Sequence, residues 1–177
     1  MKTLIVIDMQ KDFIDGALGT PEASAILPKV KAKIAAYRAR GDEIIFTRDT
    51  HGPDYMETSE GRNLPVVHCV KGTEGWEIPA ELDITGCEHI DKPSFGWTGW
   101  GTVLENGEKV PRKPYEEIEM IGVCTDICVV SNALILKALY PEVPVTVDAS
   151  CCAGVTPEKH KATLVVLRSC QVNVIGE

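Results

Sequence analysis

Cys128 stands where a cysteine can act as a nucleophile. The apolar run 118–123 predicts a buried strand, and the apolar spacing over 127–139 predicts an amphipathic helix. Cys128 then falls in the first helical turn, just past the carboxyl end of the strand. Backbone amides and the positive dipole end at a helix N-terminus favour a thiolate and can hold an oxyanion. Cys128 is therefore a candidate nucleophile.

A second interpretation of Cys128 stays open. The chain has seven cysteines, and an unpaired cysteine is commonly a small apolar core residue. Five others have no evident base in their sequence surroundings and are interpreted as structural thiols: Cys69, Cys87, Cys151, Cys152 and Cys170. Only its position separates Cys128 from them.

Two charged residues end predicted strands and can serve such a nucleophile. Asp8 follows the apolar run 4–7, and Lys92 ends a weaker strand pattern over 88–92. A nucleophilic thiol needs a base for its proton, and a nearby cation lowers its pKa and stabilises its charge. Asp8 fits the first role and Lys92 the second. The alternatives are a carboxylate that caps a loop amide and a solvated surface lysine.

A second polar cluster follows the predicted strand 43–47. Asp49, His51, Glu60 and His68 combine imidazole and carboxylate groups, which suit Zn²⁺ or a similar divalent ion. An Asp-x-His step at a strand end can aim both side chains at one point, because alternate residues share a face. Loop histidines and glutamates are normally solvated, so the spacing alone leaves both interpretations open.

The elements that must position these residues alternate between strands and helices. Strand patterns occupy 4–7, 43–47, 88–92, 118–123, 143–147 and 172–175, and helical patterns occupy 21–40, 127–139 and 157–167. This alternation predicts an α/β fold with a mostly parallel sheet covered by helices on both faces. Residues 49–76 are predicted to be a long loop, Gly41 a helix C-cap and Asp126 a helix N-cap.

Composition limits the classes of function. The chain has 177 residues, of which 44% are hydrophobic and 25% charged, and we expect one soluble domain over 1–177. A net charge of −8 argues against nucleic-acid and anionic-membrane partners. The sequence contains no glycine-rich phosphate loop, so no dinucleotide cofactor is expected. Without a signal peptide or an apolar run of ~20 residues, we expect a cytoplasmic protein with reduced thiols. Trp97 and Trp100 have two interpretations: an exposed patch that forms a homo-oligomer interface or a pocket wall, or packing residues, which is the commoner role of tryptophan.

Three segments resemble the signature segments of the isochorismatase-like cysteine hydrolases. They are Val6-Ile7-Asp8-Met9-Gln10-Lys11-Asp12-Phe13, Lys92-Pro93-Ser94-Phe95 and Gly122-Val123-Cys124-Thr125-Asp126-Ile127-Cys128, in the expected order. The resemblance implies a three-layer α/β/α fold with a six-stranded parallel sheet. It also implies a catalytic triad of Asp8, Lys92 and Cys128, and a cis peptide between Val123 and Cys124. The backbone amides of Cys124 and Cys128 would form the oxyanion hole.

Within that superfamily, Asp49-x-His51 and the segment His68-Cys69-Val70-x-Gly72-Thr73 resemble the metal site of nicotinamidases. Some members use a glutamate in place of one histidine ligand, and Glu60 matches that position better than Glu57. The implied ligands are Asp49, His51, Glu60 and His68, and Zn²⁺, Fe²⁺ and Mn²⁺ all accept them.

The resemblance also has a departure. Many nicotinamidases carry a tryptophan before the Pro and His of the metal loop, where it stacks on the pyridine ring, but here the stretch is Leu64-Pro65-Val66-Val67-His68. Contacts with a substrate ring are therefore expected from Phe13 and from Phe95 or Trp97.

The expected function is a cysteine-dependent amidohydrolase that acts on a small amide, nicotinamide or pyrazinamide. One alternative is another hydrolase of this superfamily, acting on a carbamoyl, ureido or vinyl-ether substrate. The other is a non-catalytic ligand-binding protein on the same fold.

Overall fold

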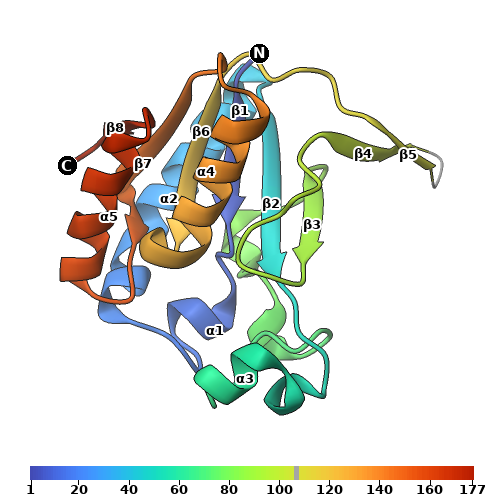
Figure 1. Ribbon diagram of the computed structural model, residues 1–177, viewed down its shortest axis with the longest axis vertical. Helices are drawn as coiled ribbons and strands as arrows, with labels where there is room; N and C mark the ends of the chain where they lie inside the picture. The colour runs from blue at the N-terminus through green and yellow to red at the C-terminus, as the bar shows by residue number, and fades with distance from the viewer. Residues whose placement is uncertain (106–107) are drawn as a thin grey trace.

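The computed structural model describes residues 1–105 and 108–177. Its centre is a six-stranded sheet in the order β3-β2-β1-β6-β7-β8, in which all neighbours pair in parallel. The strands are β1 (Thr3–Ile7), β2 (Glu43–Asp49), β3 (Glu88–Lys92), β6 (Ile118–Val123), β7 (Val145–Ala153) and β8 (Asn173–Ile175). The predicted three-layer α/β/α fold is confirmed (Figure 1).

The helices are α1 (Lys11–Ile14), α2 (Pro21–Arg40), α3 (Ser59–Asn63), α4 (Val130–Leu139) and α5 (Pro157–Ser169). Strand β1 shows how the sheet separates two cores, because successive side chains point to opposite faces. Leu4 and Val6 pack on the α2 side, whereas Ile5 and Ile7 pack on the side of α4 and α5. This central strand is buried on both faces, as its continuous apolar run predicts.

Helix α2 has the predicted bounds because both of its ends are capped. The Thr20 side chain accepts a hydrogen bond from the Ala23 N–H, and Pro21 occupies the first helical position. At the other end Gly41 adopts a left-handed φ of 72° and donates to the carbonyls of Arg38 and Tyr37.

The long segment 49–76 contains more structure than the sequence predicts. It includes 3₁₀ turns at Tyr55–Glu57 and Glu74–Trp76, with α3 between them. The Thr58 side chain caps α3 by accepting from the Gly61 N–H. A further 3₁₀ turn, Ala80–Leu82, precedes β3. A hairpin, β4 (Thr102–Glu105) and β5 (Glu108–Pro111), was not predicted, and it extends away from the sheet (Figure 1).

Strand β7 is longer than the predicted 143–147 because polar residues interrupt its apolar pattern without ending it. Asp148 accepts a hydrogen bond from the Ser150 hydroxyl (2.8 Å) and pairs with Lys33 of α2 (2.7 Å). Beyond them, Cys151 and Cys152 are buried in the strand and face opposite cores.

Trp100 is 1% exposed, so the predicted exposed tryptophan patch is wrong at this residue. Its indole N–H donates to Asn132 Oδ1 over 3.0 Å, which satisfies the polar atom of a ring packed against α4. No helix among the described residues is long and apolar enough to cross a membrane.

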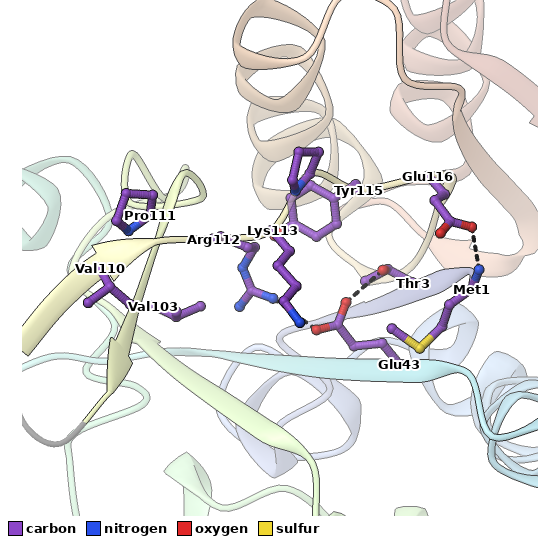
Figure 2. Close-up of a pocket in the computed structure, with 11 residues that line it drawn as sticks. Met1, Thr3, Glu43, Val103, Val110, Pro111, Arg112, Lys113, Tyr115 and Glu116 are labelled. Carbon is purple, nitrogen blue, oxygen red and sulfur yellow. Dashed lines mark hydrogen bonds and ion pairs between the residues drawn. The ribbon is translucent and has the colours of Figure 1, made fainter.

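A cavity of about 470 Å³ lies at the amino ends of β1 and β2 (Figure 2). Arg112 lies at this end of the sheet and forms ion pairs with Glu43 of β2 (2.9 Å) and with Glu88 of β3. The candidate catalytic and metal-binding residues are absent from the described lining of this cavity.

Candidate active site and metal centre

The candidate residues meet at the carboxyl edge of the sheet. Asp8 directly follows β1, Asp49 ends β2 and Lys92 ends β3, and Asp49 and Lys92 are direct partners in the strand register. Cys128 lies in the turn that follows β6. Ligands of open parallel sheets bind outside this edge.

A second cavity of about 270 Å³ opens at this edge. Its lining consists of Phe13, Leu18, Thr20, Asp49, Glu60, Leu64, His68, Phe95, Cys124, Ile127, Cys128, Val155 and Lys159. The lining is therefore mostly apolar, with two thiols, two carboxylates, an imidazole, a hydroxyl and one lysine.

Lys92 is the central charge of the site. Its Nζ lies 2.6 Å from Asp8 Oδ2, 3.5 Å from Cys128 Sγ and 3.4 Å from Asp49 Oδ1. The side chain is fully buried, so the surface-lysine interpretation is wrong. Burial alone would lower the pKa of Lys92, but the charges of Asp8, Cys128 and Asp49 raise it above its ordinary value. Lys92 therefore stays an ammonium ion.

Asp8 is held by strand β2. The Thr47 hydroxyl donates to Asp8 Oδ1 over 2.7 Å, and the Asp8 N–H donates back to the carbonyl and hydroxyl oxygens of Thr47. The Asp8 backbone has a left-handed φ of 48°, a conformation that is uncommon for a residue with a side chain. Burial raises the pKa of Asp8, against the lowering effect of Lys92. A carboxylate with a raised pKa is a better proton acceptor.

Cys128 lies in a wide helical turn, Thr125–Val129, of the π type. The peptide between Val123 and Cys124 is cis, as the resemblance implies. The Cys124 carbonyl accepts from both the Ile127 and the Val129 N–H. Turns of this type are frequent at functional sites.

Cys128 is buried, with 5% of the residue exposed. Burial and the charge of Asp8 raise its pKa, and Lys92 only partly opposes them. The sulfur therefore depends on its candidate base, Asp8, to become a nucleophilic thiolate.

The prediction that Asp126 caps this helix is wrong. Cys124 occupies the N-cap position, and Asp126 lies within the first turn. Its Oδ1 accepts instead from the Val155 N–H over 2.9 Å, which joins the turn to the segment after β7.

The four candidate metal ligands lie together, with one donor atom of each within 4.8 Å of all the others. His51 Nε2 is 2.9 Å and His68 Nε2 is 3.6 Å from Asp49 Oδ2, and both lie within 3.8 Å of Glu60 Oε1. His68 Nδ1 donates to the Val66 carbonyl over 2.8 Å, which leaves its Nε2 lone pair for a ligand. Two imidazoles and two carboxylates fit a divalent ion such as zinc, iron or manganese.

Asp49 joins this cluster to the triad. Burial would raise its pKa, but His51, His68 and Lys92 together hold it below the ordinary value, so Asp49 is ionised. Gln10 holds its backbone from both sides, since Nε2 donates to the Asp49 carbonyl (2.9 Å) and Oε1 accepts from the Asp49 N–H (2.7 Å).

A model of the isochorismatase domain matches residues 2–176. The chain belongs to the isochorismatase family. Among its relatives is the nicotinamidase/pyrazinamidase of Mycobacterium tuberculosis, which is 27% identical over 192 residues, covering 99% of this chain and 98% of the relative.

Two solved structures are similar to this protein over nearly the whole chain. A pyrazinamidase of Pyrococcus horikoshii in complex with zinc has a TM-score of 0.74 and 27% identity, covering 99% of both chains. An N-carbamoylsarcosine amidase from Thermoplasma acidophilum has a TM-score of 0.76 and 27% identity, covering 98% of this chain and 95% of that one.

Of the predicted substrate contacts, Phe13 and Phe95 line the cavity and Trp97 does not. The Trp97 N–H donates to Asn132 Oδ1 over 2.8 Å, and its ring packs on the α4 side of the core. Sequence reasoning missed other lining residues: Leu18, Thr20, Ile127, Val155 and Lys159. No local pattern distinguishes these residues, because the cavity forms only when distant segments pack together. Gln10 could have been found, since it lies within the first family segment.

Proposed function

We propose that this isochorismatase-family protein is a cysteine-dependent amidohydrolase that converts a small aromatic amide, nicotinamide or pyrazinamide, into the acid and ammonia. The observation that carries the proposal is the position of the Lys92 ammonium, within 3.5 Å of Asp8, Cys128 and Asp49. One buried cation thus contacts a base, a nucleophile and a candidate metal ligand. The nicotinamidase/pyrazinamidase relative, similar along its whole length, supports hydrolysis of an amide C–N bond.

In this proposal, Asp8 accepts the proton of the Cys128 thiol and Lys92 stabilises the resulting charges. The sulfur attacks the carboxamide carbon, and the backbone amides of Cys124 and Cys128 donate to the oxyanion; loss of one such donor typically costs about 2.7–4 kcal/mol of barrier. Asp8 then protonates the amide nitrogen, the C–N bond breaks, ammonia leaves and a thioester remains. Water, deprotonated by Asp8, hydrolyses the thioester to the acid and restores the thiol.

Asp49, His51, Glu60 and His68 would hold the divalent metal. The bound ion would supply a Lewis acid toward the nitrogen of the substrate ring. The Phe13 ring, with its centroid 5.5 Å from that of His68, gives this end of the cavity an apolar wall on which an aromatic ring can pack.

The direct test is ammonia release from nicotinamide by zinc-loaded protein, with Cys128→Ala and Cys170→Ala beside it. We expect turnover in the wild type and in Cys170→Ala, whose thiol is exposed, and none in Cys128→Ala. A folded, zinc-loaded wild type that releases no ammonia from nicotinamide or pyrazinamide would exclude this substrate class.

A carbamoyl substrate is the second candidate. Lys159 lines the cavity and has no ion pair within the part of the chain that the structure describes, and the N-carbamoylsarcosine amidase neighbour is similar at 27% identity. A free ammonium at the cavity favours a substrate that carries a carboxylate. Ammonia release from N-carbamoylsarcosine in the same assay, without release from nicotinamide, would select this candidate.

If neither substrate reacts, labelling of the thiols separates an enzyme from a binding protein. A catalytic Cys128 reacts with an alkylating reagent much faster than the other six cysteines near neutral pH. Uniform slow labelling would favour a non-catalytic protein on this fold.

A further inference from the structure

Asn132 is a fully buried polar residue in the second turn of the helical segment that carries Cys128. Asparagine is a poor helix former, and burying its amide is unfavourable unless every hydrogen-bonding group has a partner. A helix packed on an apolar core gains nothing in packing from this residue type. Its presence therefore needs a reason beyond the helix itself.

All four hydrogen-bonding positions of the Asn132 amide are occupied. Oδ1 accepts from the Trp97 N–H (2.8 Å) and from the Trp100 indole N–H (3.0 Å). Nδ2 donates to the carbonyls of Phe95 (3.0 Å) and Cys128 (2.8 Å). An amide has two lone pairs and two N–H groups, so its capacity is completely used. Only one orientation of the amide satisfies this set.

These bonds join the nucleophile's turn to the segment 95–100, which connects the end of β3 with the hairpin. Phe95 lines the active-site cavity and is 43% exposed, so its own side chain has little packing to hold it. The neighbouring Ser94 carbonyl accepts from Lys92 Nζ over 3.3 Å. The position of the backbone at Phe95 therefore sets the position of one cavity wall and of the Ser94 carbonyl, which is a hydrogen-bond partner of Lys92.

We propose that Asn132 is a positioning residue that sets the substrate-facing wall at Phe95 relative to Cys128. The inference rests on the proposed amide hydrolysis. Asn132 acts on the substrate only through Phe95, since it is absent from the cavity lining. Its loss should therefore weaken substrate binding much more than it slows the chemical step.

The main variant is Asn132→Ser. A serine here can still donate to the carbonyl four residues earlier, as Ser131 does to Ile127 (2.6 Å), but it is too short to reach Phe95 and Trp97. We expect KM for the amide to rise about tenfold with kcat within about threefold of wild type. Asn132→Leu, which removes every bond, should show the same KM and a lower kcat.

Two comparisons separate positioning from general destabilisation. Ser131→Ala removes a side-chain bond to the same helical turn without touching the segment 95–100, and it should leave KM unchanged. In a Phe95→Ala background, Asn132→Ser should raise KM less than about twofold, because coupled residues are non-additive. Three outcomes would overturn the proposal. KM could be unchanged in Asn132→Ser, or Asn132→Ser could raise KM as much in the Phe95→Ala background as in the wild type. The third is an Asn132→Ser variant that melts below the assay temperature.

Failure of the proposed function has a distinct signature. If the wild type hydrolyses no amide, KM cannot be measured, and the rate at which N-phenylmaleimide labels Cys128 is measured instead. Mass spectrometry identifies the labelled cysteine. A displaced Phe95 wall exposes the 5% accessible thiol, so Asn132→Ser should label about tenfold faster than wild type and than Ser131→Ala. Equal rates would overturn the positioning role whatever the substrate is.

Discussion

At the scale of single residues, the site depends on charges that are buried together. Asp8, Lys92 and Asp49 are each at most 2% exposed, and any one of them alone in this place would be strongly unfavourable. Together they satisfy one another, and Lys92 is the shared partner. The hydrogen bonds that orient these groups should therefore affect the reaction as strongly as the groups themselves.

Thr47→Val tests this orientation. The change removes the hydroxyl that donates to Asp8 Oδ1 and preserves the shape of the side chain. A hydrogen bond to a charged group contributes about 1.5–3 kcal/mol, so we expect kcat to fall by about tenfold to a hundredfold. Steady-state kinetics of ammonia release measures the effect.

Thr3→Val is the matched control, because Thr3 donates to the Glu43 carboxylate (2.7 Å) at the opposite end of the sheet. Its kcat should equal that of wild type. Equal losses in the two variants would mean that Thr47 acts only through stability.

At the scale of elements, α2 and β7 are joined by a polar contact as well as by the core. Lys33 of α2 pairs with Glu119 of β6 (2.6 Å) and with Asp148 of β7 (2.7 Å). Burial would raise the pKa of Asp148, but the bonds from Lys33 and Ser150 lower it below its ordinary value. The contact thus stabilises the fold while Asp148 is ionised.

Lys33→Met should lower the free energy of unfolding by about 1–3 kcal/mol at pH 7, because two largely buried carboxylates lose their cation. A carboxylate whose pKa is lower in the folded state stabilises the fold at pH values above its ordinary pKa. This stabilisation is lost as the pH falls through the folded-state pKa. The difference between wild type and variant should therefore shrink below about pH 4. Urea unfolding at several pH values measures it.

Lys31→Met is the comparison, since Lys31 forms only an exposed pair with Glu81 at 3.7 Å. We expect little change in its unfolding midpoint. A pH-independent loss in Lys33→Met would show that packing, not charge, is responsible.

At the scale of the whole molecule, the candidate catalytic and metal-binding residues lie at the carboxyl edge of the sheet. None of them is among the described residues that line the cavity at the amino edge. Gln10 connects three parts of the carboxyl edge. It follows β1, holds the backbone of Asp49 at the end of β2, and donates to the carbonyl of Trp76, the last residue of the segment 49–76 (2.9 Å). Metal binding and folding of this segment should therefore be linked.

Gln10→Leu tests this linkage. A ligand that binds only the folded state raises Tm, and loss of a bond that orients a metal ligand typically costs tenfold to a hundredfold in metal affinity. We expect the rise in Tm on adding zinc to chelator-treated protein to be about 3–10 °C smaller in the variant. The Tm of the chelator-treated variant alone reports the purely structural loss. A zinc-dependent rise equal to that of wild type would contradict the role of Gln10.

The features that local physics controls could be predicted from the amino-acid sequence. The alternation of apolar runs and helical spacing predicted six strands and three main helices, and the Thr20 and Gly41 caps agree with the bounds of α2. It also placed Asp8, Asp49 and Lys92 at strand ends. Parallel strands share an edge, so local information was enough to bring those residues to one side of the sheet.

The contacts of those residues depend on the packing of distant segments and could not be predicted. The burial of Lys92, the meeting of four ligand atoms within 4.8 Å and three of the four bonds of Asn132 involve residues far apart in the chain. The same contacts remove Trp97 from the cavity and bury Trp100, against expectation. A local sequence pattern predicts periodicity and capping, whereas each of these contacts depends on how distant segments pack together.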